Sequence, residues 1–337
     1  MNVIITGGSG YIGTHIIESL LENPKVDHII NIDLNPSTIK HSKIENKIGD
    51  IRNSKLCEEL EIEGDYSYCI HLAALCKEPG FEWDQYFETN HQGTINVIEL
   101  CDSLGIEEII FTSTMMVYKA GEYQRNESSI TSPDTAYGIS KLLGEKELFA
   151  WKAKKRSKRK IKVVRPAVVF GENENANFTR LYKSLKKGFF PYVGKSTTIK
   201  SSIYVKELVS FIDFLTSKNV DSDIFNLAFP EDQSIKKIIE IFKEVFRIRS
   251  FNPIIPYKLL LLIARGFEML NAMGLTNSIH HRRIQKLYFS TNIFPQNALS
   301  AGYVFKYNLK SSLEDWEQSN DPNIVRKYAT IATIFVL

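Results

Sequence analysis

The first half of the chain alternates short apolar runs with longer segments in which apolar residues recur at helical spacing. The first run, Val3–Ile5, ends at a glycine-rich turn, and apolar positions three and four apart follow in Ile12–Leu21. Further strands are predicted at His28–Asp33, Tyr68–Leu72, Glu108–Ser113 and Lys162–Arg165. Helices are predicted between them at Ser54–Leu60, Tyr86–Leu104 and Tyr137–Trp151. This alternation predicts an α/β fold with a buried parallel sheet covered by helices on both faces.

The pattern changes after Pro166, where polar residues, glycines and prolines interrupt the alternation, and a helix-rich portion follows from Ile235. Ser202–Val205 is strand-like and Glu207–Ser217 is helix-like, so this part of the chain can return to the first domain. The prediction is a doubly wound domain at residues 1–166, joined again by residues 201–228. Residues 167–200 and 229–337 then form a smaller C-terminal α/β region that binds the substrate.

Composition narrows the class of protein. The 337 residues are 43% hydrophobic and 24% charged, which is typical of a folded chain. A formal net charge of +3 does not indicate nucleic-acid binding. The four cysteines are scattered without a Cys-x-x-Cys pair, so neither a zinc site nor a disulfide framework is expected. A reducing cytoplasm is the natural location, and Met1 leads directly into a strand without the pattern of a signal peptide.

Two segments raise the question of a membrane or a partner. Lys152–Lys160 holds seven basic residues in nine, which indicates a solvated helix end or attraction to an anionic membrane surface. Charged residues interrupt the apolar stretch Ile254–Leu275, which is therefore not expected to span a bilayer. Burial is its first interpretation, and a subunit interface or interfacial membrane contact is the alternative. The apolar tail Ile331–Leu337 is shorter still.

A glycine motif marks a candidate dinucleotide site. Gly7, Gly10 and Gly13 lie between the first strand and the first helix, where backbone N–H groups and the helix N-terminus can receive a pyrophosphate. Asp33 ends the second strand, where a carboxylate can accept hydrogen bonds from ribose hydroxyls and would repel a 2′-phosphate. The sequence therefore predicts a Rossmann-type domain that binds NAD rather than NADP, and no metal.

A second motif carries acid/base chemistry. Tyr137 and Lys141 are four residues apart, one turn along the same helix face. A nearby cation stabilises a phenolate, so Tyr137 can remove a proton from a substrate hydroxyl. Thr112-Ser113-Thr114 ends a strand at the sheet edge where α/β proteins bind ligands, and a hydroxyl there can orient the substrate oxygen.

These motifs occur together in one known family. The chain resembles extended short-chain dehydrogenases/reductases of the NAD-dependent epimerase/dehydratase group, and the glycine segment is similar to that of UDP-galactose 4-epimerases. The resemblance extends over about residues 1–215. The segments that carry it are Thr6-Gly7-Gly8-Ser9-Gly10-Tyr11-Ile12-Gly13, Gly49-Asp50-Ile51-Arg52, His71-Leu72-Ala73-Ala74, Thr112-Ser113-Thr114, Tyr137-x-x-x-Lys141 and Arg165-Pro166.

The resemblance implies roles for individual residues. Thr114 would be the catalytic hydroxyl, Tyr137 the acid/base and Lys141 the residue that holds the nicotinamide ribose. Asn90 would pack beneath the site with a structural side chain. The cofactor-binding residues would be Gly7, Gly10, Tyr11, Ile12, Gly13, Asp33, Asp50, Ile51, Leu72, Ala73, Ala74, Asn90, Tyr137 and Lys141. The substrate-binding residues would be Thr114, Asn177 and Lys200, with Arg282 or Arg283 as a second phosphate contact.

Departures from the family pattern bear on the reaction. Family dehydratases carry an Asp-Glu pair after the catalytic Thr, whereas this chain has Met115 and Met116, which transfer no protons. Val168 replaces an Asn found in many epimerases. We expect a 4-epimerase of a UDP-hexose or UDP-N-acetylhexosamine that works through a 4-keto intermediate and forms a homodimer. An NAD(P)H-dependent nucleotide-sugar 4-ketoreductase and a non-catalytic NAD-binding regulator stay open as alternatives.

Overall fold

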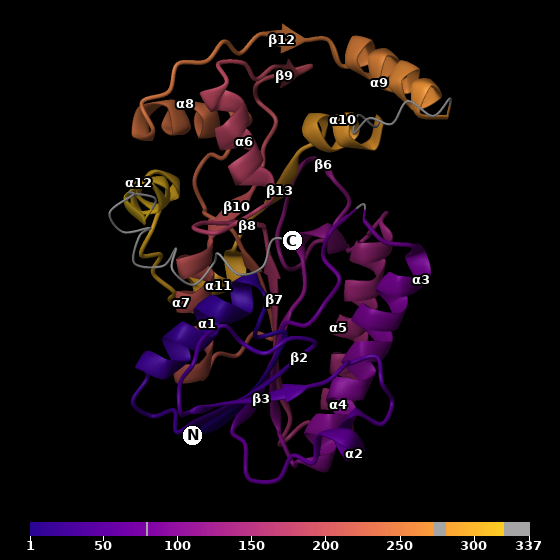
Figure 1. The fold of residues 1–337 in the computed structure, drawn as a ribbon, viewed down its shortest axis with the longest axis vertical. Helices are drawn as coiled ribbons and strands as arrows, with labels where there is room; N and C mark the ends of the chain where they lie inside the picture. Colours follow the sequence, from indigo (N-terminus) through magenta and orange to yellow (C-terminus); the bar gives the residue numbers. More distant parts are fainter. Residues whose placement is uncertain (79, 273–280, 320–337) are drawn as a thin grey trace.

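A seven-stranded, fully parallel sheet forms the centre of the protein. The computed structural model describes residues 1–78, 80–272 and 281–319. Along the sheet the strand order is β11-β7-β5-β4-β1-β2-β3 (Figure 1). The strands are β1 (Asn2–Thr6), β2 (His28–Asp33), β3 (Ile44–Ile48), β4 (Tyr68–His71), β5 (Glu108–Thr112), β7 (Lys160–Pro166) and β11 (Ile224–Leu227). This order confirms the predicted α/β, doubly wound fold, with its switch point between β1 and β4.

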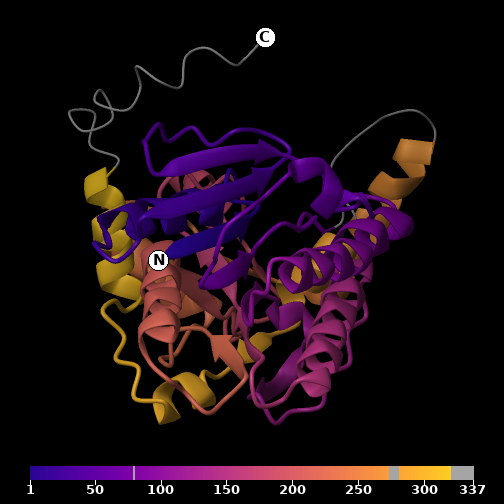
Figure 2. The same cartoon turned by 90° about the horizontal axis from the view of Figure 1, so that it is seen from below.

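Helices cover both faces of this sheet (Figure 2). One layer contains α1 (Tyr11–Glu22) and α7 (Val205–Ser217). The opposite layer contains α2 (Leu56–Leu60), α3 (Trp83–Tyr86), the π-helix Phe87–Gln92, α4 (Gly93–Ser103) and α5 (Ala136–Lys154). Successive β1 residues belong to different cores: Val3 and Ile5 pack in one and Ile4 in the other. The apolar run of β1 is continuous because both of its faces are buried.

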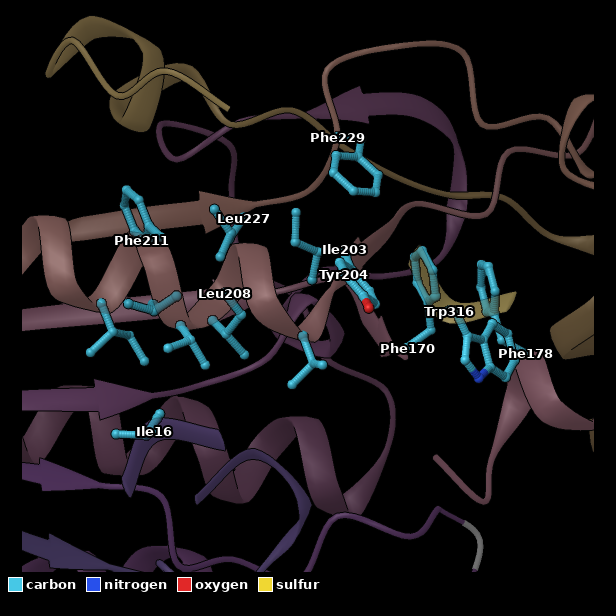
Figure 3. Packing of buried hydrophobic residues seen from close by; sticks show 14 of the residues in the cluster. Ile16, Phe170, Phe178, Ile203, Tyr204, Leu208, Phe211, Leu227, Phe229 and Trp316 are labelled. Carbon is cyan, nitrogen blue, oxygen red and sulfur yellow. The ribbon is translucent and has the colours of Figure 1, made fainter. Parts of the chain in front are cut away.

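The C-terminal region is anchored in the first of these cores. Phe170 and Phe178 stack with ring centroids 4.1 Å apart, and Trp316 lies beside Phe170 (Figure 3). The same cluster includes Ile16 of α1 and Leu208 of α7. The elements involved are β8 (Val168–Phe170), α6 (Asn177–Lys186), β10 (Ser202–Tyr204), α8 (Ile235–Val245) and α12 (Leu309–Ser319). One continuous core therefore connects the sheet to the region beyond it.

Short elements complete the end of the molecule beyond the carboxyl ends of the strands (Figure 1). They are β6 (Gly121–Arg125), β9 (Tyr192–Val193), β12 (Ile254–Ile255), α9 (Tyr257–Ala272), α10 (His281–Tyr288) and β13 (Thr291–Ile293). Helix α11 (Gln296–Ser300) lies instead beside β11, where the Asn297 side chain donates to the Ile224 carbonyl at 2.8 Å. Within the described ranges no helix is long and apolar enough to cross a membrane. The same residues contain no cluster of metal-ligating side chains.

The apolar stretch Ile254–Leu275 forms β12 and α9, and its last three residues lie outside the described part of the chain. The expected burial is wrong for Leu259, Leu262 and Ile263, whose side chains are exposed. They follow one face of α9, whereas Ala264 on the opposite face is buried. The helix therefore packs through one side only. The apolar tail at residues 331–337 also lies outside the described residues.

The basic run lies at the opposite end, where α5 finishes and β7 begins. Two of its members are engaged within the fold. The Lys152 ammonium pairs with Asp223 at 2.6 Å, and the Arg159 guanidinium stacks 4.5 Å from the Trp151 ring centroid and binds Asp102. The remaining basic side chains extend into solvent, as expected for a helix end.

Candidate active site

The glycine turn after β1 is shaped by close backbone packing. Gly7 has φ +76°, and a Cβ there would lie 2.6 Å from the backbone nitrogen of Ala73. A Cβ on Gly13 would lie 2.4 Å from the carbonyl oxygen of Gly7. Gly10 differs, because a Cβ there would meet only that oxygen, at 3.3 Å. Gly10 begins α1 without a side-chain cap, so the helix N-terminus at Tyr11 and Ile12 is open to an anion.

Asp33 lies beside this turn at the end of β2. Its carboxylate accepts hydrogen bonds from the backbone N–H groups of Ser9 and Asn35, each at 3.1 Å. The side chain of Tyr11 points elsewhere: its hydroxyl is buried without a partner, next to Gly171. Burial, reinforced by Glu174, raises the pKa of Tyr11 above its usual value. Only the backbone of Tyr11 therefore contributes to the turn.

A surface pocket lies at Asp50, one of the two residues predicted to border the adenine of a cofactor. Its lining includes Asp50, Arg52 and Gln92. The Arg52 guanidinium, 2.6 Å away, lowers the pKa of the Asp50 carboxyl. Ile51 does not line this pocket: it is buried against the start of α4, where a Cβ on Gly93 would come within 2.7 Å of it. Asp50 therefore lines the pocket, whereas Ile51 belongs to the core.

The segment after β4 passes directly beside the glycine turn. Leu72 and Ala73 both donate backbone hydrogen bonds to the carbonyl of Thr6, at 2.9 and 3.0 Å. These bonds hold Leu72, Ala73 and Ala74 at the carboxyl edge of the sheet, where a doubly wound fold binds its ligand. All three are half-buried.

Tyr137 and Lys141 lie at the start of α5, next to the end of β5. The helix is capped by Thr135, whose hydroxyl accepts from the Gly138 N–H at 3.1 Å. The Lys141 ammonium is buried 4.0 Å from the Phe111 ring centroid. Burial lowers the pKa of Lys141 to about 7, partly opposed by Glu145. A buried amine of this kind is unusual in a purely structural position.

The Tyr137 phenol lies close enough to the Thr114 hydroxyl for the hydroxyl to influence its pKa. Burial raises the pKa of Tyr137 above its usual value, whereas the hydrogen bond with Thr114 lowers it. Thr114 is buried at the end of β5, where its Oγ1 also accepts from the Met116 N–H at 3.2 Å. The ring of Tyr86 lies 6.3 Å from that of Tyr137. The three residues predicted to be catalytic are therefore brought together at one edge of the sheet.

Asn90 connects the segment after β4 to helix α5. Its amide donates to the Leu75 carbonyl and to the Ser140 hydroxyl, both at 3.0 Å, and its Oδ1 accepts from the Leu75 N–H at 2.8 Å. Ser140 in turn donates to the Tyr137 carbonyl at 2.9 Å. Asn90 is fully buried in the π-helix. It therefore acts as a positioning residue for the start of α5.

Glu145 and Arg165 form the centre of a buried hydrogen-bond network that the sequence did not predict. Glu145 accepts from the Arg165 Nε at 2.9 Å and from the Ser113 hydroxyl. Arg165 also donates to the Tyr118 hydroxyl at 2.7 Å. Burial opposes the charge of Arg165, but Glu145 outweighs it and raises the pKa of the guanidinium. Glu145 also follows Lys141 by four residues on α5, but that spacing does not indicate Arg165, on β7, as its partner.

The predicted substrate residues occupy different environments. Asn177 is exposed at the first position of α6. The Lys200 ammonium instead donates to the carbonyls of Lys286 and Phe289 at the end of α10, and burial lowers its pKa to about 8. A phosphate contact by Lys200 would require these bonds to break. The side chains of Arg282 and Arg283 lie outside the described residues.

Comparison with known proteins finds a family model and curated relatives that match this chain. The family model described as the NAD dependent epimerase/dehydratase family matches residues 3–228. One curated relative is the N-acetyl-alpha-D-glucosaminyl-diphospho-ditrans,octacis-undecaprenol 4-epimerase of Escherichia coli O157:H7. The chain is 28% identical to it over 316 residues, which cover 93% of each protein.

Two solved structures share the fold at low identity. The UDP-glucose 4-epimerase of Thermotoga maritima with UDP-glucose matches with a TM-score of 0.74 at 19% identity, over 98% of this chain and all of the other. The UDP-glucuronic acid 4-epimerase of Bacillus cereus in complex with NAD matches with a TM-score of 0.72 at 20% identity, over 95% of this chain and 97% of the other. Both matches extend beyond the sheet into the C-terminal region.

Proposed function

Because the chain belongs to the NAD-dependent epimerase/dehydratase family, we propose that it is an NAD-dependent 4-epimerase of a sugar joined to a diphosphate. A UDP-hexose or UDP-N-acetylhexosamine is the expected soluble substrate. The observation that carries the proposal is the placement of Tyr137 and Lys141 one turn apart at the start of α5, with Thr114 close to Tyr137 and Phe111 of β5 against Lys141, at the carboxyl edge of the sheet. The reaction would pass through a 4-keto sugar.

The residues around the turn fit a dinucleotide. Gly10 leaves the N-terminus of α1 open, and Asp33 is held beside it by two backbone N–H groups. The first feature suits a pyrophosphate and the second suits ribose hydroxyls. Bound NAD supplies a hydride acceptor that can also return the hydride. Asp33 favours NAD over NADP because a 2′-phosphate would meet its carboxylate.

Tyr137 is the proposed acid/base, with its proton exchanged at the phenol oxygen. The Tyr137 phenol resists ionisation, because its partial removal from solvent raises its pKa. The Thr114 hydrogen bond opposes this, and a protonated Lys141 one turn away adds a positive charge. In the ligand-free protein, burial also disfavours the protonated form of Lys141 by lowering its pKa to about 7. Both groups should therefore reach their working charge states only when the site is filled.

Support for epimerisation over dehydration comes from the residues after Thr114. Met115 and Met116 form the 3-10 turn Met115–Val117 at the place where an additional acid and base would be needed. Thioethers transfer no protons. Asn177 and Lys200 are proposed as substrate contacts, Lys200 only if it releases its carbonyl partners. The homodimer also stays a prediction.

Two kinds of group, a nucleotide or a polyprenol, could carry the sugar diphosphate in this proposal. The solved neighbours are described with UDP-sugars or NAD, whereas the curated relative of nearly equal length is named for a sugar on undecaprenyl diphosphate. A nucleotide and a polyprenol present the same diphosphate to the protein. The family alone does not separate them.

The test is turnover of UDP-glucose and UDP-N-acetylglucosamine by purified protein without added reductant. We expect formation of the 4-epimer, a rate that rises with pH as Tyr137 ionises, and a loss of about 10³-fold in Tyr137→Phe. Tyr123→Phe, which removes an exposed hydroxyl on β6, is the matched control. Stoichiometric use of NADH or NADPH by a 4-keto sugar would indicate the reductase instead. Unchanged turnover in Tyr137→Phe would exclude this acid/base role.

A further inference from the structure

Charge is divided unequally between the two regions of the chain. Residues 167–200 and 229–337 contain 20 basic and 11 acidic residues, a net charge of +9, whereas the remaining residues contain 22 and 28, a net charge of −6. Residues 175–206 hold seven basic residues and residues 245–267 hold four, and neither segment contains an acidic residue. The formal charge of +3 therefore conceals a strongly basic C-terminal region.

Helix α9 combines this charge with exposed apolar side chains. Leu259, Leu262 and Ile263 are 48%, 69% and 44% exposed, and their spacing places them on one face. Lys258 and Arg265 are exposed one turn from Leu262, along the edge of that apolar face. An exposed apolar stripe bordered by cations is the pattern of a helix that lies in a membrane interface.

Other exposed apolar residues lie at the same end of the molecule. Ile254 of β12 is 58% exposed, and Figure 1 shows that β12 and α9 form the outermost edge beyond the carboxyl ends of the strands. Phe251, just before β12, is exposed beside Phe189, with ring centroids 6.3 Å apart. This is the end of the molecule to which the candidate active site also opens.

We propose that α9 and the Phe251–Ile254 segment dock on an anionic lipid bilayer, and that the sugar diphosphate turned over at the active site is carried by a polyprenyl lipid in that bilayer. The second part rests on the proposed epimerase function. Docking places the site over the lipid surface, so the diphosphate can enter while its hydrocarbon chain stays in the membrane. The basic side chains attract the anionic headgroups.

The structure disfavours two alternatives: membrane docking through the basic run, and a second copy of this chain bound to α9. The basic run Lys152–Lys160 begins 15 residues after Tyr137 along α5, about 22 Å away at 1.5 Å per residue. Docking through that run would hold the site away from the surface. A second copy of the chain would bring like charges together across a two-fold axis, which opposes association.

The first experiment is sedimentation with phosphatidylglycerol-containing and pure phosphatidylcholine vesicles at low and high salt. We expect the protein to pellet with anionic vesicles at low salt, and Leu262→Asp/Ile263→Asp to lose about 10-fold or more in vesicle affinity. Val304→Asp is the control, since Val304 is 79% exposed between α11 and α12. Circular dichroism establishes that each variant is folded. Absence of pelleting, or equal pelleting by the double variant, would overturn the docking surface.

The second experiment compares two substrates. The double variant should turn over UDP-N-acetylglucosamine within about two-fold of the unmodified protein, and should lose about 10-fold or more with the polyprenyl-diphosphate-linked sugar in vesicles. Equal loss with both substrates would overturn the inference, as would light scattering that shows a dimer dissociated by the substitutions. Absence of epimerisation with either substrate, together with α9-dependent vesicle binding, would refute the proposed function and support the docking surface.

Discussion

Replacing the buried amine should make the ligand-free protein more stable. Burial lowers the pKa of Lys141 from 10.5 to about 7, so between these pH values the unfolded chain binds more protons than the folded one. Folding is therefore penalised at low pH, and stability increases as pH rises through this window. The pKa shift of Lys141 lowers the free energy of unfolding by about 4–5 kcal/mol at pH 6 and by about 2 kcal/mol at pH 9.

Lys141→Met removes this penalty while keeping most of the side-chain volume and the contact with Phe111. Allowing about 1 kcal/mol for imperfect repacking, we expect the free energy of unfolding of the variant to exceed that of the unmodified protein by about 3–4 kcal/mol at pH 6 and by about 1 kcal/mol at pH 9. Turnover should be lost at both pH values.

The assay is urea denaturation of both proteins at pH 6, 7.5 and 9, without cofactor. Lys146→Met, an exposed lysine on the same helix, is the control and should change stability by less than about 0.5 kcal/mol at every pH. The informative quantity is the difference between variant and unmodified protein, because other titrating groups cancel. A difference that does not change with pH, or a destabilised variant at pH 6, would refute the reasoning.

Three other substitutions test the packing around the site by chemical denaturation. Gly7→Ala should lower the free energy of unfolding by about 3 kcal/mol or more, because residue 7 has φ +76° and a Cβ there would lie 2.6 Å from the backbone of Ala73. Gly105→Ala, with φ +68° and open space around it, should lower it by only about 1 kcal/mol. Equal losses in the two variants would contradict the packing argument. Asn90→Ala should cost about 2–3 kcal/mol and slow turnover, since it leaves buried polar groups unpaired; unchanged stability would disprove this role. Arg165→Met should cost about 3–5 kcal/mol, most of it recovered when Glu145→Met is added; a double variant as unstable as the single one would argue against the ion pair as the cause.

Several features of the site follow from local sequence. A continuous apolar run predicts a strand buried on both faces, which holds for β1 and β4, and a four-residue spacing places Tyr137 and Lys141 on one face of α5. Strand β3, in contrast, was not predicted. It is an edge strand, half exposed and rich in polar residues, so its sequence lacks the buried pattern.

The sequence by itself determined the fold class, the glycine turn and the helix that presents Tyr137, because each depends on residues within a few positions of one another. Only the tertiary structure decided that Asn90 connects Leu75 to Ser140, that Glu145 pairs with Arg165, and that the Lys200 ammonium binds carbonyls of α10. It also decided that one apolar face of α9 is left exposed. These features join residues 15 to 89 positions apart, or depend on which surfaces remain uncovered, and no local spacing encodes either.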